Sequence, residues 1–109
     1  MGSAVSTAAP RTITFAARQL QRKFKHAVDF GVTGPYSRAQ AMNFERAIRA
    51  HVEDEATLVI TGTYRGESVT HFVNPQTGVH VMRDAQHAFV SGWRLTPAQL
   101  VHVLTRGSL

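Results

Sequence analysis

The sequence predicts an α+β domain, with two N-terminal helices packed on a four-stranded antiparallel meander sheet and a short C-terminal helix. Apolar residues in the first half of the chain recur at helical spacing. In the second half, β-branched and aromatic residues form four short runs separated by stretches of hairpin length. Helices that precede a meander are typical of the α+β class, and we expect them to cover one face of the sheet.

The first predicted helix covers residues 12–28. Its apolar positions lie three and four residues apart, as in a helix with one buried face; they are Ile13, Ala16, Ala17, Leu20, Phe24, Ala27 and Val28. The second predicted helix follows Ser37, which forms an S-x-x-Q capping box with Gln40, and it runs to about Val52.

The last predicted helix begins after Thr96. Thr96 serves as N-cap, Pro97 occupies the first helical position and Gln99 completes a capping box. The residues expected to face inward are Leu100, Val103 and Leu104.

The four predicted strands are residues 57–64, 69–74, 79–83 and 88–93. Strict alternation along the last strand places Phe89, Ser91 and Trp93 on one face and Ala88, Val90 and Gly92 on the other. The second set is small and apolar, so we expect it to face the helices.

Composition and charge narrow the functions to consider. The chain has 109 residues, a formal net charge of +5 and no cysteine, which excludes disulfides and favours a polyanionic partner such as nucleic acid. We divide it into residues 1–11, a linker or cloning remnant, and residues 12–109, a single domain. No apolar run approaches the roughly 18 residues of a membrane span, so no membrane insertion is expected.

A basic stretch, Lys23-Phe24-Lys25-His26, is the first candidate for chemistry. It contains the only two lysines among 12 lysines and arginines. Lysine carries a compact positive charge and histidine exchanges a proton near neutral pH, so together they suit reactions at phosphate. On a regular helix Lys23 and His26 share one ridge, while Lys25 points away. If all three contact one substrate, the helix must end or distort near Lys25, before the turn at Gly31.

Ser91 and Trp93 on the last strand are further candidates. A serine hydroxyl can bond a phosphate oxygen, and an aromatic ring can stack on an unpaired base. Gly92 between them permits another part of the chain or a ligand to approach closely. The alternative interpretation is that Trp93 belongs to the core and Ser91 is an ordinary strand residue.

The six histidines lack the spacings of a metal site, because H-x-H, H-x-x-x-H and H-E-x-x-H are all missing. We therefore expect neither a metal nor another cofactor. His71 and His80 fall on predicted strands and are expected at cross-strand or surface positions.

Two separated blocks of the sequence can be compared with known families. They are Lys23-Phe24-Lys25-His26-Ala27 followed by Asp29-Phe30-Gly31, and Phe89-Val90-Ser91-Gly92-Trp93 followed by Leu95-Thr96-Pro97, with Asn74-Pro75 between them. In this order the blocks resemble the colicin D-like nuclease domains of polymorphic bacterial toxins. The resemblance extends from about Leu20 to Pro97.

The resemblance implies a metal-independent ribonuclease that cleaves the anticodon loop of tRNA and inhibits translation, with arginine tRNAs as the substrate in colicin D itself. It implies that His26 is catalytic and that Lys23, Lys25, Ser91 and Trp93 belong to the active site. It also implies an acidic immunity protein as partner. Such domains end large secreted toxins, including bacteriocins and contact-dependent inhibitors, and act in the cytoplasm of the target cell. We expect a monomer.

Metal-independent cleavage occurs when the 2′-hydroxyl of RNA attacks the adjacent phosphorus and leaves a 2′,3′-cyclic phosphate. The reaction needs a base, an acid and positive charge at the phosphorane. His26 is the candidate for proton transfer, as base or as acid, and the second group, water or a lysine, stays open. Two alternative functions are a basic RNA-binding domain that leaves RNA intact and a metal-dependent DNA nuclease.

Overall fold

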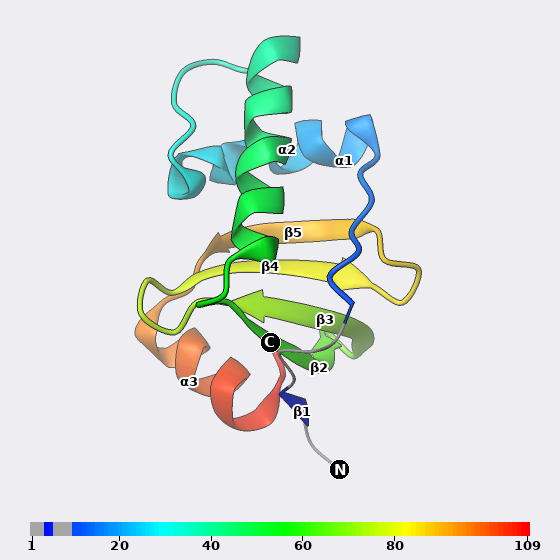
Figure 1. Ribbon diagram of the computed structural model, residues 1–109, viewed down its shortest axis with the longest axis vertical. Coiled ribbons are helices and arrows are strands. Elements are labelled where there is room, and N and C mark those ends of the chain that lie inside the picture. The colour runs from blue at the N-terminus through cyan, green and yellow to red at the C-terminus, as the bar shows by residue number, and fades with distance from the viewer. Residues whose placement is uncertain (1–3, 6–9) are drawn as a thin grey trace.

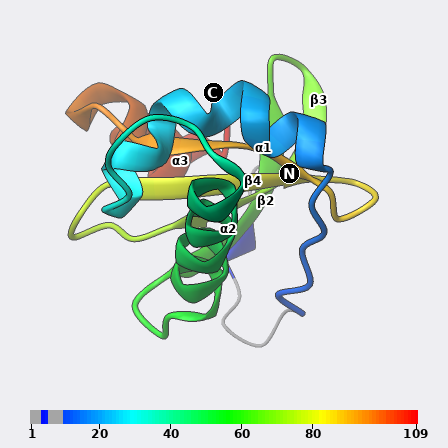
Figure 2. The ribbon, with the colours of Figure 1, turned by 90° about the horizontal axis from the view of Figure 1, so that it is seen from above.

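The computed structural model describes residues 4–5 and 10–109 and shows one twisted sheet with helices around it (Figures 1 and 2). In chain order the elements are β1 (Ala4–Val5), α1 (Ala17–Lys23), the 3₁₀ helix η1 (Phe24–Phe30), α2 (Arg38–Glu53), β2 (Leu58–Tyr64), β3 (Glu67–Val73), β4 (Val79–Asp84), β5 (Phe89–Arg94) and α3 (Pro97–Arg106). The strands lie in sequence order, each antiparallel to its neighbour. The α+β class and the meander, here β2–β5, are therefore confirmed. The linker predicted for residues 1–11 falls mostly on residues 1–3 and 6–9, which lie outside the described residues.

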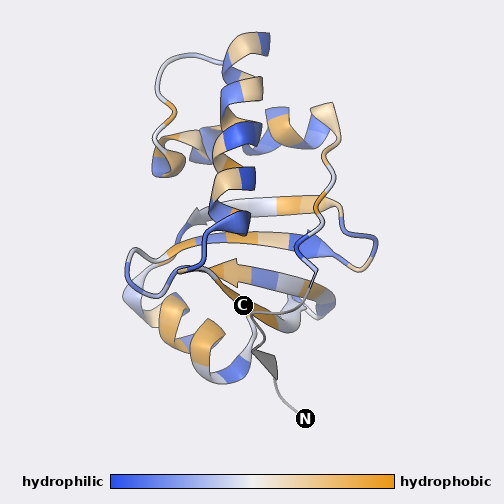
Figure 3. Cartoon of the chain, in the orientation of Figure 1, coloured by the Kyte–Doolittle hydropathy of each residue, from blue (hydrophilic) through white to orange (hydrophobic). Residues whose placement is uncertain are grey.

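The sheet separates two hydrophobic cores. On β2 the neighbouring residues Val59 and Ile60 are both buried, although they point to opposite faces, so both faces need cover. Helix α2 packs Phe44 and its apolar neighbours on the Val59 face, and α3 packs Val103 on the Ile60 face. Helices therefore lie on both faces of the sheet, contrary to the expectation of one covered face. Figure 3 shows apolar residues recurring along these helices and central strands, whereas the loops joining β3, β4 and β5 are hydrophilic.

Residues 12–16, predicted as the start of the first helix, are not helical. Thr14 donates its N–H to the His87 carbonyl and accepts from the Phe89 N–H, both at 2.8 Å. Ile13 is buried in the core beneath α2. The run contains β-branched and aromatic residues, which favour an extended backbone. Its apolar spacing was compatible with a helix, but pairing with the end of β4–β5 decides its conformation.

The first helix changes its geometry near Lys25, where a common substrate contact of Lys23, Lys25 and His26 would require it. The α-helix ends at Lys23 and continues as the seven-residue 3₁₀ helix η1, a length that is uncommon because 3₁₀ hydrogen bonds are poorly aligned. Gly31 ends η1 with a φ of 82°, and the Val32 N–H donates to the Ala27 carbonyl at 3.1 Å. This left-handed cap needs a residue without a side chain.

The helix caps largely follow the sequence. The Ser37 hydroxyl accepts from the Gln40 N–H at 3.1 Å and caps α2, but the Gln40 side chain donates to the Thr33 carbonyl rather than completing the box. For α3, the full capping box of Thr96 and Gln99 is present. Leu104 is 37% exposed, so it does not face inward as predicted. None of the helices in the described ranges is both long and apolar enough to cross a membrane.

A β-bulge in β5 reverses two predicted orientations. Met82 pairs with Ser91 but Arg83 pairs with Phe89, so Val90 is the extra residue. As a result Phe89 joins the core beneath α2, while Val90 lines a cavity on the other side of the sheet. The predicted faces of Phe89 and Val90 are therefore wrong, because a bulge interrupts strict alternation.

Candidate active site

The segment α1–η1 lies along the outer edge of β5. The Gln19 side chain donates to the Val90 carbonyl at 2.6 Å, and the Asp29 carboxylate accepts from the Arg94 N–H at 2.9 Å. These two side chains occupy backbone groups that an edge strand would otherwise leave unpaired. They also fix η1, and with it His26, against the last strand.

Gly92 allows this close approach. A Cβ atom at Gly92 would lie 2.9 Å from the His80 carbonyl oxygen and 3.0 Å from Cζ of Phe30. Two groups therefore approach Gly92 closely, the backbone of the neighbouring strand β4 and the side chain of Phe30 in η1. The Phe30 contact packs η1, the element that contains His26, against β5.

His26 and Trp93 are in contact. Their ring centroids lie 5.8 Å apart and the rings are tilted by 38°. The indole N–H of Trp93 donates to the Gln99 side-chain oxygen at 3.3 Å, and the rings of His80 and Tyr64 lie 5.4 and 6.1 Å from the Trp93 ring. Gln99, His80 and Tyr64 thus fix the Trp93 ring, which also contacts the candidate catalytic histidine.

The charges around His26 favour an anion. Burial lowers the pKa of His26 below its ordinary 6.5, the ammonium groups of Lys25 and Lys23 lower it further, and the Asp29 carboxylate partly opposes them. Burial also lowers the pKa of Lys23, followed by repulsion from Lys25, Arg65 and Arg22. At neutral pH the imidazole is therefore mainly neutral, and it lies among cations.

The five predicted site residues differ in how near they lie to one another and in how exposed they are. His26 and Trp93 touch, and both lysines lie close enough to His26 to change its pKa. Lys25 is exposed and also lines a cavity of about 320 Å³ with Phe24 and Tyr36. Ser91 lies two residues before Trp93 on β5 and is only 1% exposed. Its hydroxyl is thus hardly accessible in this conformation.

Two residues that the sequence did not indicate, Tyr64 at the end of β2 and Arg65 in the turn that follows, also lie near the site. Arg65 has a φ of 51°, and its guanidinium lies 5.1 Å from the centre of the Tyr64 ring. Both side chains border a cavity of about 410 Å³ that also contacts Trp93. The sequence shows only a turn here, because the approach of this turn to Trp93 depends on the twist and packing of the whole sheet.

A buried pair of histidines lies behind Trp93. His71 Nδ1 and His80 Nε2 are 2.8 Å apart, and both residues have 0% exposure. His71 Nε2 must carry a proton because it donates to the carbonyls of Thr63 and Gly107, each at 3.1 Å. His80 Nε2 then donates to His71, and His80 Nδ1 has no partner among the described residues.

The two histidines are diagonal cross-strand neighbours on β3 and β4, since His71 pairs with Met82 and His80 with Val73. A cross-strand position was one of the two predicted for them, and they are buried rather than at the surface. Within residues 4–5 and 10–109, no three His, Cys, Asp or Glu side chains gather in an arrangement that could hold a metal ion.

Sequence and structure comparisons agree on the relatives of this chain. Colicin-D of Escherichia coli is 36% identical over 85 residues, which are 76% of this chain and 12% of that protein. A solved structure, described as a ribonuclease from Escherichia coli complexed with its inhibitor protein, has a TM-score of 0.75 and 35% identity, and the match covers 84% of this chain and 100% of that chain. The sequence model of the Colicin D family matches residues 19–103, a range that holds all five predicted site residues. The chain therefore belongs to the colicin D family.

Proposed function

We propose that this chain is the ribonuclease domain of a bacterial toxin and that it cuts the anticodon loop of tRNA, with arginine tRNAs as the first candidates. The observation that carries the proposal is the contact of His26 with Trp93, close to the positive charge of Lys23 and Lys25. A proton-transfer group, a stacking surface and positive charge are what metal-independent RNA cleavage needs. Membership of the colicin D family and the likeness to a solved ribonuclease support it.

His26 acts as the base in this proposal. Its lowered pKa keeps the imidazole neutral at pH 7, so it can accept the proton of the 2′-hydroxyl. The 2′-oxygen then bonds to phosphorus while the bond from phosphorus to the 5′-oxygen breaks. The products are a 2′,3′-cyclic phosphate and a free 5′-hydroxyl, and DNA is not a substrate because it lacks the 2′-hydroxyl.

The other site residues act on the phosphate and the base. Lys23 and Lys25 stabilise the charge of the phosphorane, and Lys23, whose lowered pKa makes it a stronger acid, protonates the leaving 5′-oxygen. Trp93 stacks on a base next to the cut. Ser91 donates to a phosphoryl oxygen, which requires a local movement because its side chain is buried.

The positive charge of the site also suggests an inhibitor. In the related solved structure, the ribonuclease is complexed with its inhibitor protein. We propose an acidic immunity protein that places carboxylates against Lys23, Lys25 and Arg65 and so excludes RNA. We also propose that the domain reaches the cytoplasm of a target cell as part of a longer secreted toxin, since the chain spans 12% of its curated relative.

The test is incubation of the purified chain with total bacterial tRNA in EDTA, followed by sequencing of the fragment ends. We expect discrete anticodon-loop cuts with cyclic-phosphate ends. His26→Ala should reduce the rate by about 10²- to 10⁴-fold, the usual loss when a positioned base is removed. His87→Asn, which removes an exposed imidazole in the β4–β5 turn, should keep activity.

Three results would contradict this function. If tRNA is shifted on a gel but stays intact, the chain is an RNA-binding domain. If EDTA abolishes cleavage, the nuclease depends on a metal. If His26→Ala cuts at the parent rate, His26 is not the base.

A further inference from the structure

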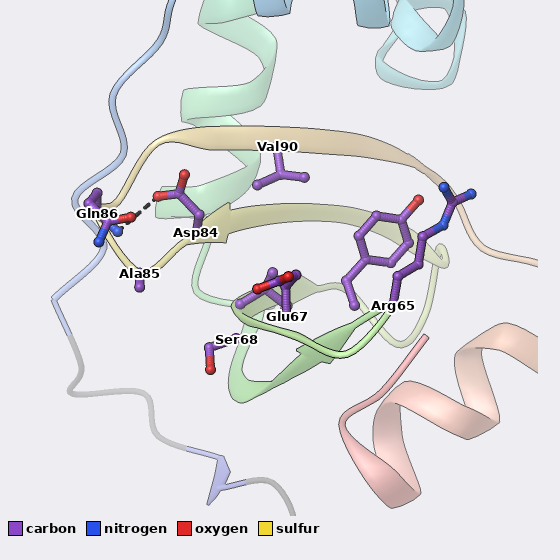
Figure 4. A pocket seen from close by; sticks show the side chains of 9 residues that line it. Arg65, Glu67, Ser68, Asp84, Ala85, Gln86 and Val90 are labelled. Carbon is purple, nitrogen blue, oxygen red and sulfur yellow. Dashed lines mark hydrogen bonds between the residues drawn. The ribbon is translucent and has the colours of Figure 1, made fainter.

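A further cavity, lined by residues of β2, β3, β5 and the β4–β5 turn, is separate from the His26–Trp93 contact and has no role in the proposed cleavage step. It has a volume of about 650 Å³, within the range of small-ligand sites. We call it the Val90 cavity; its lining residues are Tyr64, Arg65, Glu67, Ser68, Val69, Asp84, Ala85, Gln86 and Val90. Figure 4 shows Val90 pointing into it from β5, between Asp84 at one end and Arg65 at the other.

We propose that the Val90 cavity binds the base of a nucleotide adjacent to the cleaved phosphate, and that it selects guanine. This inference rests on the proposed ribonuclease function and identifies a substrate subsite for it. Four observations carry it, namely the bulge that forms the cavity, its continuity with the candidate active site, the distribution of charge along its walls and the shape of its lining.

The β-bulge creates the cavity. With regular alternation, Phe89 would project to this side of the sheet and Val90 would face α2. The bulge instead turns the large Phe89 ring into the core and leaves only the smaller Val90 side chain over the cavity. Bulges beside functional sites commonly redirect a side chain in this way.

The cavity adjoins the candidate active site. Tyr64 and Arg65 line both the Val90 cavity and the smaller cavity that contacts Trp93. The Tyr64 and Trp93 rings lie 6.1 Å apart. Val90 and Trp93 are three positions apart on β5, about 10 Å at the usual rise of a strand. A strand of RNA with its cleaved phosphate at His26 can therefore reach the cavity with a neighbouring nucleotide.

The Val90 cavity has a positive charge at one end and two carboxylates in its lining, so its end suits a phosphate and its interior suits a base. Arg65 lies at the end near Lys23, whose pKa it lowers, and this end attracts the phosphate backbone. Glu67 and Asp84 line the cavity itself, where two carboxylates repel phosphate but accept hydrogen bonds from the N–H groups of a base.

The carboxylates of Asp84 and Glu67 differ in how firmly the protein holds them. Asp84 Oδ1 accepts the N–H groups of Gln86 and Ala88 at 2.9 and 3.0 Å, which fixes the carboxylate and leaves Oδ2 without a hydrogen bond among the described residues. Glu67 is exposed at the start of β3. Guanine presents adjacent N1–H and N2–H donors that match both oxygens of one carboxylate, whereas uracil offers a single donor, so Glu67 favours guanine.

The remaining walls suit a flat, apolar ring system. Val69 and Val90 present methyl groups, and Tyr64 adds an aromatic ring that Arg65 covers on one side. Arg65 occupies a left-handed backbone conformation that favours glycine or asparagine. Positive φ at Arg65 and Gly66 is the usual geometry of a two-residue hairpin turn, and here it holds the Arg65 guanidinium beside the Tyr64 ring.

The test uses guanosine 3′-monophosphate and uridine 3′-monophosphate as probes, with NMR shifts of the Val90 methyl groups as readout. We expect the guanosine probe to shift these signals with at least tenfold higher affinity than the uridine probe. Glu67→Gln should reduce this preference about tenfold, because a charged hydrogen-bond acceptor is lost. Ala85→Phe, a change in an exposed turn, should fill the cavity and abolish the shifts, whereas Glu53→Gln on α2 should leave them unchanged.

The outcomes separate this inference from the proposed function. Equal affinity for the two probes, or binding by Ala85→Phe with the parent affinity, overturns the guanine cavity even if tRNA is cleaved. Loss of binding in Ala85→Phe together with an intact guanine preference in the parent supports it, and these titrations do not depend on cleavage. In cleavage assays Glu67→Gln should raise KM about tenfold with little change in kcat, since it acts on binding.

Discussion

His26 is subject to opposing electrostatic effects from residues on its own helical segment. Lys25 and Lys23 lower its pKa, and Asp29 raises it. Removing Lys25 therefore raises the pKa of His26 toward 6.5. If His26 is the base, kcat/KM decreases as the pH falls below its pKa, because the protonated imidazole cannot accept a proton. Lys25→Ala should consequently move the acidic limb of the kcat/KM profile to higher pH, and an NMR titration of His26 should show the same direction.

The electrostatic effect can be separated from a direct role of Lys25 by comparing variants. Lys25→Arg keeps the positive charge and should keep the acidic limb near its parent position, while Lys25→Ala should move it and also lower the maximal rate. An acidic limb that stays in place or moves to lower pH in Lys25→Ala would show that His26 does not act as the base.

Single residues of the site were only partly predictable. Lys23, Lys25 and His26 were identified because lysine is rare in this chain and the three residues lie within one run of four. The roles of Tyr64 and Arg65 depend on the distance between a turn and Trp93, which no local pattern contains. The orientation of Val90 depends on a bulge, and a run of six residues with regular alternation gives no sign of where one residue is added.

At the level of elements, η1 depends on a small number of bonds to β5. Asp29 accepts the Arg94 N–H at 2.9 Å, and it also affects His26. Asp29→Ala should cost about 0.5–1.5 kcal/mol, the usual net contribution of a hydrogen bond, because this bond is exposed to solvent, and it should speed amide exchange along the outer edge of β5. Asp29→Asn keeps an acceptor oxygen and should recover part of the stability. Both variants lower the pKa of His26, so a difference in cleavage rate between them measures the bond rather than the charge.

Urea unfolding measures the stability of the parent and of the Asp29 variants, and hydrogen exchange measures the protection of the Arg94 amide. Equal stability of the parent and Asp29→Ala, with equal protection of Arg94, would mean that η1 is held by its apolar residues Ala27 and Phe30 alone. Ala27 is only 1% exposed, so apolar packing is a real alternative to the Asp29 hydrogen bond as the interaction that holds η1.

The elements that the sequence predicted well are those with local signals. Thr96, Pro97 and Gln99 defined the start of α3, and the hairpin turns bounded β2–β5 within one or two residues. The helix predicted for residues 12–16 was wrong. Their apolar spacing fits a helix, but their conformation is decided by hydrogen bonds to His87 and Phe89, more than 70 residues away. The place of α3 on the opposite face was decided by the sheet, which is apolar on both sides.

Across the whole molecule, buried groups connect the C-terminal segment to the site. Gly107 accepts from His71, His71 pairs with His80, and the rings of His80 and Trp93 pack in a T-shaped arrangement with their centroids 5.4 Å apart. Gly107 also packs against Gly62, where a Cβ atom would lie 1.8 Å from the Gly107 carbonyl oxygen. A row of buried residues on β3, β4 and the end of α3 therefore supports Trp93, and protonation of its two histidines is expected to lower the stability of the fold.

Acid should destabilise the protein through this row. Burial lowers the pKa of His71 and places that of His80 well below 6.5, with repulsion from His71 and His51 adding to the effect on His80. As the pH falls below 6.5, the unfolded chain binds protons that the folded chain does not, so the free energy of unfolding decreases by about 1.4 kcal/mol per pH unit for each proton. Above pH 6.5 this contribution to stability is complete. Urea unfolding between pH 7.5 and 5 should show the decrease.

Substitutions identify which group binds the proton. His80→Leu removes the imidazole whose Nδ1 has no partner among the described residues and should reduce the dependence on pH by about one proton, whatever its effect on stability at pH 7.5. Met82→Leu changes a buried residue beside His71 without removing a titratable group, so it should keep the full dependence. If His80→Leu loses stability with the same slope as the parent, the acid sensitivity does not come from His80, and His71 and the partly buried His51 become the groups to replace next.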